Sequence, residues 1–205
     1  MKYKVMIVED QTMPRELFEL RVQASERFEL ALSIDNAALA DVYCLRFPVD
    51  LILMDVITRD GENGLDAAAR IKRAFPQIKI IIVTSMPECS YLKRAKEIGV
   101  ESFWYKEEQR ESLLDVMERT MNGESVYPGA SPELTLGMAS SYQFTERELD
   151  ILREITSGDT NQEIADRLNM SVATVKTHIL NMLEKTGFRN RTELAVRARE
   201  SGLVI

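Results

Sequence analysis

The sequence predicts an α/β protein: a doubly wound, five-stranded parallel sheet, followed by a small all-α domain of four helices with a helix-turn-helix. Three observations predict this fold class. Short apolar runs alternate with amphipathic stretches up to about residue 122, which is typical of a parallel sheet with helices on both faces. Residues 123–141 are rich in glycine, proline and serine, and after them only helix signals remain.

Five strands are predicted in the first part of the chain, over residues 3–8, 29–34, 51–54, 80–83 and 101–105. Helices are predicted over residues 14–25, 37–47, 64–75, 88–98 and 109–122. Pro14 fits the first turn of a helix, and Gly99 and Gly123 lie just beyond two helix ends. We therefore expect a first domain over residues 1–122, with its binding groups at the carboxyl ends of the strands.

The second domain is predicted over residues 142–205, after a linker at 123–141 in which residues 132–138 could form a short helix. Thr145 and Thr160 each have glutamate three positions later, the capping box that begins a helix. Asn190 begins a similar pattern, and Ser171 is a further N-cap candidate. Four short helices in about 60 residues form a compact helical domain.

Composition excludes several classes of protein. The 205 residues carry a net charge of −7 and are 45% hydrophobic, so the chain is neither disordered nor a protein that coats nucleic acid by bulk charge. Two distant cysteines and one histidine argue against a disulfide framework, a zinc site or multi-histidine catalysis. The longest apolar runs are far shorter than the roughly 20 residues of a membrane span. We expect a cytoplasmic protein with no membrane contact.

Charged or hydroxyl-bearing side chains lie at the carboxyl ends of four predicted strands: Glu9 and Asp10, then Asp55, Thr84 and Lys106. Taken singly, each has an ordinary explanation, such as a helix cap, a strand-forming threonine or a solvated lysine. Together they meet at one sheet edge, where three carboxylates need a cation between them. Oxygen ligands favour Mg²⁺. A carboxylate beside the metal can accept a phosphoryl group.

In the second domain, residues 160–180 have the spacing of a helix-turn-helix, with Leu168-Asn169-Met170 as the turn. The helix after the turn has a core face at Val172, Val175, Ile179, Met182 and Leu183, while Ala173, Thr177, Leu180, Asn181 and Glu184 point outward. Residues 142–166 carry seven acids and two bases, whereas residues 167–205 carry seven bases and three acids. Local phosphate binding would suit the basic half; a helical hairpin that only packs is the alternative.

Residues 3–122 resemble the receiver domain of bacterial two-component response regulators, on Glu9-Asp10, Asp55 after Leu51-Ile52-Leu53-Met54, Thr84 and Lys106. The resemblance implies a flavodoxin-like fold for this first domain, and it implies that Asp55 takes phosphate from a sensor histidine kinase. It also implies that Glu9, Asp10, Asp55 and the carbonyl of Ile57 bind Mg²⁺, that Thr84 and Lys106 bind the phosphoryl oxygens, and that Phe103 is the switch aromatic. Two positions depart from the family: Lys106-Glu107 replaces the usual Lys-Pro, and the loop after Asp55 lacks a proline and has one extra residue.

Residues 142–203 resemble the LuxR-type DNA-binding domain. The motifs are Phe144-Thr145-Glu146-Arg147-Glu148, Asn161-Gln162-Glu163-Ile164-Ala165, Thr174-Val175-Lys176-Thr177-His178 and Lys185-Thr186-Gly187. The resemblance implies that Thr160, Asn161, Thr174, Lys185 and Arg191 lie toward DNA phosphates and that Lys176, Thr177 and Leu180, with Asn181 beside them, face the bases. His178 would be structural, and no residue is catalytic.

A receiver followed by this module defines the NarL/FixJ class, and implies a transcription regulator controlled by phosphorylation of Asp55. Its implied partners are a sensor histidine kinase and a double-stranded DNA operator. We expect a homodimer on phosphorylation, because one helix reads too few bases for useful specificity. The predicted helix at residues 191–201 would form the interface, since Ala195, Val196 and Ala198 give it a small-residue surface suited to pairing. Two alternatives stay open. One is a phosphate-independent regulator; the other is a phosphatase with an aspartyl-phosphate intermediate, which the apolar Ile57 two residues after Asp55 disfavours.

Overall fold

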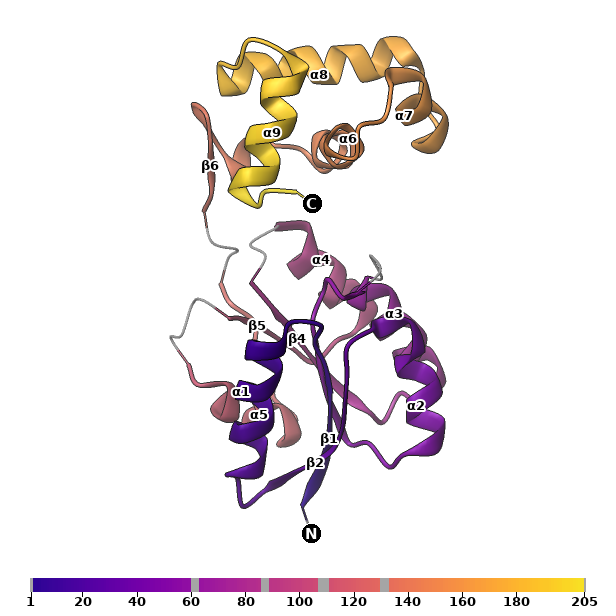
Figure 1. Ribbon diagram of the computed structural model, residues 1–205, viewed down its shortest axis with the longest axis vertical. Helices are drawn as coiled ribbons and strands as arrows, with labels where there is room; N and C mark the ends of the chain where they lie inside the picture. The colour runs from indigo at the N-terminus through magenta and orange to yellow at the C-terminus, as the bar shows by residue number, and fades with distance from the viewer. Residues whose placement is uncertain (1, 60–62, 86–88, 107–110, 130–132, 205) are drawn as a thin grey trace. The chain divides into compact units, whose positions relative to one another are not determined.

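In the computed structural model, the chain forms two compact units, one of residues 1–85 with 91–129 and the other chiefly of residues 130–205 (Figure 1). The structure describes residues 2–59, 63–85, 89–106, 111–129 and 133–204. The predicted fold class is confirmed: the first unit is a parallel sheet with helices and the second is built mainly of helices.

A five-stranded parallel sheet forms the centre of the first unit, in the order β2-β1-β3-β4-β5. Its strands are β1 (Tyr3–Val8), β2 (Phe28–Ile34), β3 (Leu51–Met54), β4 (Lys79–Thr84) and β5 (Ser102–Tyr105). Each lies within a residue or so of its predicted position. The order changes direction between β1 and β3, so the carboxyl ends of these two strands form the crevice where ligands bind in such sheets.

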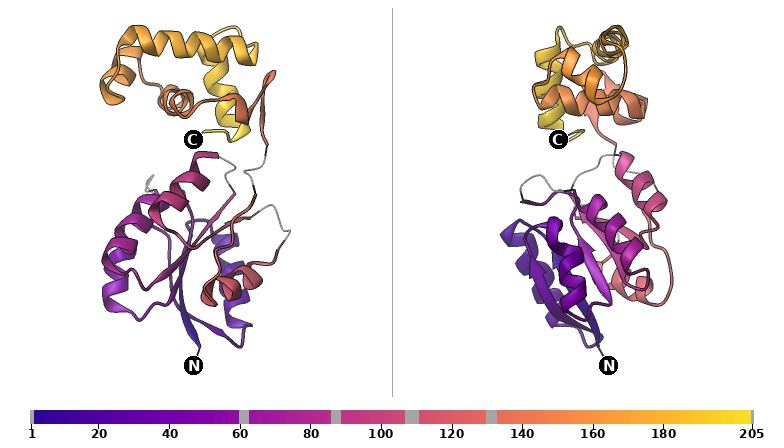
Figure 2. Two further views of the ribbon diagram at one scale, coloured as in Figure 1. Left: turned by 180° about the vertical axis from the view of Figure 1, so that it is seen from behind. Right: turned by 90° about the vertical axis from the view of Figure 1, so that its right-hand side faces the viewer.

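Helices cover both faces of the sheet (Figure 2). They are α1 (Thr12–Gln23), the 3-10 turn η1 (Ala37–Leu39), α2 (Ala40–Arg46), α3 (Gly64–Ala74), α4 (Cys89–Ile98) and α5 (Leu113–Met121). Phe18 and Val22 of α1 and Val116 and Met117 of α5 share one apolar core with inward residues of all five strands of this sheet. Strands β3 and β4 are buried along nearly their whole length, which is why their sequences read as continuous apolar runs.

The second unit begins with a β-hairpin, β6 (Thr135–Leu136) paired antiparallel with β7 (Ala139–Ser140). The prediction of a short helix over residues 132–138 is therefore wrong for the described residues of that segment. Gly137 adopts φ +62°, a left-handed conformation that closes the tight turn and that favours glycine. Leu136 and Ala139 are buried in the core of the helical unit, so burial of this pair outweighs the weak helical pattern.

A 3-10 turn, η3 (Ser141–Gln143), leads into four helices: α6 (Glu146–Thr156), α7 (Asn161–Arg167), α8 (Val172–Thr186) and α9 (Arg191–Ser201). The predicted N-caps are confirmed. Thr145 and Thr160 form complete capping boxes, and the side chains of Ser171 and Asn190 each accept a hydrogen bond from the backbone of the first turn. None of the helices that the structure describes has the length and apolarity required to cross a bilayer.

Candidate metal-binding pocket and nucleic-acid interface

The predicted acidic pocket forms at the carboxyl ends of β1 and β3. Glu9, Asp10 and Asp55 each place a carboxylate oxygen within 4.8 Å of the others. Glu9 and Asp55 are buried, whereas Asp10 is partly exposed. Three oxygen donors at this separation fit a hard divalent cation, because it can neutralise several carboxylates at once and keep water on its open side.

Lys106, at the end of β5, lies in the same pocket. Its Nζ is 2.7 Å from Asp55 Oδ2 and 2.5 Å from Glu9 Oε2. The other oxygen of Asp55 accepts a hydrogen bond of 2.7 Å from the backbone N–H of Val56. These contacts fix the orientation of the Asp55 carboxylate. Sequence analysis missed the Val56 amide, because every non-proline residue has a backbone N–H and its role depends on the fold alone.

The electrostatics of the pocket oppose three negative charges. Burial, and then the neighbouring Asp55 carboxylate, raise the pKa of Glu9 to about 7, although Lys106 and the Gln11 amide act against this rise. Burial also raises the pKa of Asp55, against the pull of Lys106. For Lys106, burial lowers the pKa but the two carboxylates outweigh it, and the net change is upward. Lys106 therefore stays positively charged. A bound cation would further stabilise the ionised carboxylates of Glu9 and Asp55.

Thr84 ends β4 and is fully buried, and Phe103 in β5 is 1% exposed. The strand register pairs Ile82 with Phe103 and Thr84 with Tyr105. The predicted switch residues therefore lie on adjoining strands, two residues out of direct register. The Lys106–Glu107 bond, at which the sequence departs from the family, lies outside the described residues, as do residues 60–62 of the longer loop after Asp55.

The loop after Asp55 returns closely to the pocket. Ile57 pairs with Asn63 in an isolated antiparallel bridge, and Gly64 N donates to Val56 O at 2.7 Å. A Cβ on Gly64 would stand 1.8 Å from the Asp55 carbonyl oxygen. Glycine at the start of α3 thus allows the backbone to approach the predicted phosphoacceptor. The sequence alone gives no sign of this close approach.

In the helical unit, α7 and α8 adopt the predicted helix-turn-helix. Asn169 in the turn has φ +51°, and asparagine tolerates this left-handed conformation. The predicted core face is confirmed, since Val175, Ile179 and Met182 are buried and Val172 and Leu183 pack against the same core. The outward set is exposed, as are Thr174 and Lys176; Leu180 is 60% exposed.

Three of the five residues predicted to lie toward phosphates come together. Arg191, at the start of α9, donates hydrogen bonds to the side-chain oxygen of Asn161 and to the carbonyl of Asp159. Thr160 lies between them and caps α7. Two helix N-termini and an arginine therefore meet, which is a suitable place for an anion. Thr174 lies elsewhere, at the N-terminus of α8, where its hydroxyl is 2.7 Å from that of Ser171.

Lys185 lies in a different setting from the other predicted phosphate-contacting residues. Its ammonium is 2.8 and 2.7 Å from the two carboxylate oxygens of Glu148 and donates to Gln143 O at 2.9 Å. Burial raises the pKa of Glu148, but the contacts with Lys185 and Thr145 outweigh it and the net change is downward. This lysine is thus bound within its own unit.

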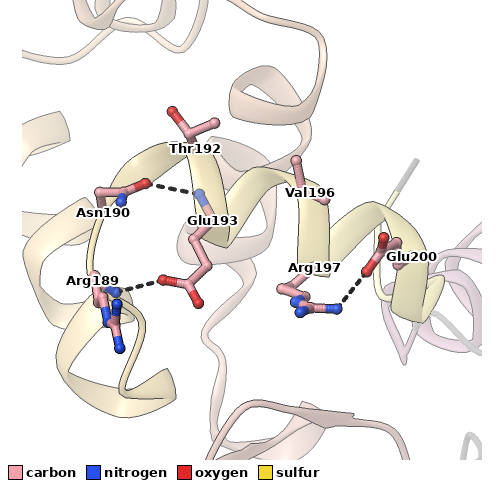
Figure 3. A pocket seen from close by; sticks show the side chains of 7 residues that line it. All are labelled: Arg189, Asn190, Thr192, Glu193, Val196, Arg197 and Glu200. Atoms are coloured by element: carbon pink, nitrogen blue, oxygen red, sulfur yellow. Dashed lines mark hydrogen bonds and ion pairs between the residues drawn. The ribbon is translucent and has the colours of Figure 1, made fainter.

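Figure 3 shows the outer face of α9, which lines a shallow depression with Arg189, Asn190, Thr192, Glu193, Val196, Arg197 and Glu200. The predicted pairing surface of Ala195, Val196 and Ala198 is wrong in part. Ala198 is fully buried and Ala195 packs against the core, because small residues allow α9 to approach α6 and α8 closely. Val196 alone of the three is exposed, at 49%.

Comparison with known proteins gives the class of the chain. Residues 5–118 match the family described as "Response regulator receiver domain", and residues 142–198 match "Bacterial regulatory proteins, luxR family". The chain therefore belongs to the response regulator family. It is a transcription regulator of the two-component type, with a receiver domain that works with a histidine kinase and a LuxR-type domain that binds DNA.

Among individual relatives, the chain is 33% identical to "Response regulator protein VraR" of Staphylococcus epidermidis and 32% identical to the Staphylococcus aureus protein of that name, each over the full length of both chains. A solved structure of RcsB from Salmonella enterica serovar Typhimurium, bound to a promoter in the presence of phosphomimetic BeF₃⁻, matches with a TM-score of 0.62 at 19% identity, covering 99% of this chain and 100% of that one. The response regulator ChrA, of a heme-sensing two-component system, has a TM-score of 0.54 at 21% identity and covers 98% of both chains. These structural likenesses support the fold.

Proposed function

We propose that Asp55 is the phosphoacceptor of this response regulator and that Glu9, Asp10, Asp55 and the carbonyl of Ile57 hold Mg²⁺ during the reaction. The observation that carries this proposal is the convergence of three carboxylates and Lys106 on one pocket. The side chain of Asp55 is 6% exposed, so only a small part of it is accessible to a donor.

The residues have separate tasks in the transfer. A carboxylate oxygen of Asp55 forms a bond to phosphorus as the bond from phosphorus to the kinase histidine breaks, and that bond's electrons leave with the imidazole, which takes a proton from solvent. The Val56 amide holds the other Asp55 oxygen. Mg²⁺ supplies charge neutralisation for the transferred group. Lys106, already in the pocket, and Thr84 then bind phosphoryl oxygens.

Phosphorylation adds about −1.5 to −2 of charge to the pocket. We propose that this charge biases a two-state arrangement of Thr84 and Phe103, which alters dimerisation or domain release and so changes operator binding. Lys176, Thr177, Leu180 and Asn181 would face bases, and Thr160, Asn161, Thr174, Lys185 and Arg191 would face phosphates. We place this activity in the cytoplasm, where a DNA operator is accessible.

An enzymatic function is disfavoured. An aspartyl-phosphate phosphatase needs a general acid near the nucleophile, and the residue two positions after Asp55 is the apolar Ile57. We therefore propose that the protein is not an enzyme. A phosphate-independent regulator is also disfavoured, because the acids and the lysine that phosphorylation requires are gathered in one pocket.

Intact mass after incubation with acetyl phosphate, with and without Mg²⁺, tests the chemistry. We expect a +80 Da species that requires Mg²⁺ and is absent from Asp55→Asn. The output is tested by the mobility of complexes with an operator duplex, selected by binding from a random pool, with and without the phosphodonor. Persistence of the +80 Da species in Asp55→Asn would exclude Asp55 as the only site.

A further inference from the structure

The segment that leaves α5 runs along the outer edge of β5. Gly123 turns the chain with φ +95°, after which Phe103 N donates to Val126 O at 2.8 Å and Val126 N donates to Ser102 Oγ at 3.1 Å. β5 is an edge strand of the sheet, and an edge strand presents backbone groups that lack a partner within the sheet. Residues 124–128, here called the linker strap, supply one.

Neighbouring side chains of the linker strap lie on opposite faces of the sheet edge. Val126 packs against the core that β5 shares with α1 and α5. The ring centroid of Tyr127 lies 6.4 Å from that of Phe103, and Lys96 Nζ of α4 lies 5.1 Å from the Tyr127 centroid. This alternation is that of a strand. It means that the strap is held at its backbone and on both faces.

The hydroxyl of Tyr127 donates to the carbonyl of Val100 at 2.7 Å. Burial, and then the charge of Glu101, raise the pKa of Tyr127, so the phenol remains a neutral donor. Tyr127 is therefore anchored at its tip and packed along its ring, and it retains one orientation.

Phe103 connects the linker strap to the strand end at the acidic pocket. The centroid of its ring lies 5.0 Å from that of Tyr105 and 6.4 Å from that of Tyr127. Its own amide binds Val126. Any displacement of Phe103 thus acts on the strap at two points. Thr84 lies on the adjoining strand β4, so if Thr84 moves toward a phosphoryl group on Asp55 and Phe103 shifts with it, the contact between the rings of Phe103 and Tyr127 changes.

We propose that Tyr127 is a positioning residue that couples Phe103 to the interdomain linker. In the unphosphorylated protein the Phe103–Tyr127 contact holds the linker strap on β5, and phosphorylation weakens that hold and frees the strap. The inference rests on the proposed phosphorylation of Asp55. It adds the route by which the receiver signals to the chain that leads to the DNA-binding domain.

Hydrogen exchange of the full chain, followed by mass spectrometry with and without acetyl phosphate and Mg²⁺, tests the hold directly. We expect the amides of Phe103 and Val126 to exchange faster in the phosphorylated protein. Stoichiometric +80 Da product with unchanged exchange at both amides would overturn the coupling while leaving the proposed phosphorylation intact. Absence of the +80 Da product in the wild-type protein would instead overturn the proposed function, and the coupling with it.

Variants test the role of the ring. In the wild-type protein, phosphorylation should change affinity for the selected operator duplex by about fivefold or more, the usual lower bound for coupling between sites. In Tyr127→Ala this ratio should fall to about twofold or less, because the unphosphorylated strap is already released. Tyr127→Phe keeps the ring and should retain more of the ratio than Tyr127→Ala.

Tyr43→Ala is the matched control, since Tyr43 forms an aromatic pair with Phe47, 6.1 Å apart, at α2 and not at the strap. It should keep the wild-type ratio. If Tyr127→Ala takes up phosphate and keeps the wild-type ratio, the inference is wrong. If Tyr127→Ala does not fold, the exchange measurement on the wild-type protein decides.

Discussion

Lys185 of α8 binds both carboxylate oxygens of Glu148 in α6, at 2.8 and 2.7 Å, and so joins the second helix of the helix-turn-helix to the first helix of its unit. Glu148 also completes the capping box of Thr145. A lysine predicted to contact DNA phosphates is thus engaged within the fold. Its three N–H donors face three acceptors of its own unit, the two Glu148 oxygens and the Gln143 carbonyl, so its contribution is to orient α8.

We expect Glu148→Gln to destabilise the protein by about 1–3 kcal/mol at pH 7, the range for losing hydrogen bonds between charged groups. The pKa of Glu148 is lowered on folding from its ordinary value of 4.5. A lowered pKa stabilises above the unfolded value, and this contribution is lost as the pH falls through the folded value. The difference between wild type and variant should therefore be constant above about pH 5.5 and shrink below pH 4.5.

Calorimetric unfolding of the full chain across this pH range measures the effect. Glu184→Gln is the control, because Glu184 lies exposed beside Lys185 on α8 and its loss should change stability by less than about 0.5 kcal/mol. A difference between wild type and Glu148→Gln that grows on acidification would contradict the lowered pKa.

Gly64→Ala should destabilise the first unit by about 1–3 kcal/mol, the range for overpacking a tight site. The added Cβ would stand 1.8 Å from the Asp55 carbonyl oxygen, so α3 or the strand end carrying Asp55 must move. The rate of +80 Da labelling by acetyl phosphate should fall as well. Denaturant unfolding and intact mass are the two measurements.

Gly129→Ala provides the comparison, because a Cβ at Gly129 meets no atom within 4 Å. It should leave both the midpoint of unfolding and the labelling rate as in wild type. Equal effects of the two substitutions would show that the close approach of Gly64 to Asp55 is not the cause of the lost stability and labelling rate.

The sequence predicted most of the fold because each local signal agreed with the final packing. The apolar runs at β3 and β4 and the caps at Thr145 and Thr160 are local features that survive in the structure. The hairpin at Thr135–Ser140 could not be predicted, since its two-residue strands have no period and depend on burial of Leu136 and Ala139.

The site residues also form two groups, those that the sequence predicted and those that only the structure shows. Asp55, Glu9 and Lys106 follow from their places at strand ends, because parallel strands bring these ends together. The pairing of Lys185 with Glu148 and the packing of Tyr127 on Phe103 join residues 37 and 24 positions apart. Neither contact has a periodic or spacing signal, so three-dimensional packing was needed to find them.

A dimer on DNA is predicted to depend on Val196 of α9, the exposed apolar residue of its outer face (Figure 3). We expect Val196→Asp to keep the stability of the chain within about 0.5 kcal/mol, as for a surface change. It should convert complexes of two chains per operator duplex into complexes of one, because a carboxylate would be desolvated in the interface.

Sedimentation on the selected operator duplex measures the number of chains bound. Val42→Asp, a change of equal charge at an exposed apolar residue of α2, controls for the added negative charge of the chain. Two chains per duplex for Val196→Asp at the wild-type concentration would show that α9 does not form the interface.

Leu180 projects from the outward face of α8 with 60% of its surface exposed, so its own unit does not explain an apolar residue there. We expect it to contact a thymine methyl in the major groove, where apolar side chains read A·T pairs. Leu180→Ala should then reduce discrimination at one A·T position by about 1 kcal/mol and leave the dependence on salt unchanged, because no phosphate contact is lost. Leu180→Lys should strengthen binding to all sequences and steepen the salt dependence by about one ion.

Titration of both variants against single-base changes of the selected operator separates the two effects, and Ala173→Ser, an exposed change on the same face, serves as the control. Affinities for Leu180→Ala equal to wild type on every duplex would remove Leu180 from the reading surface.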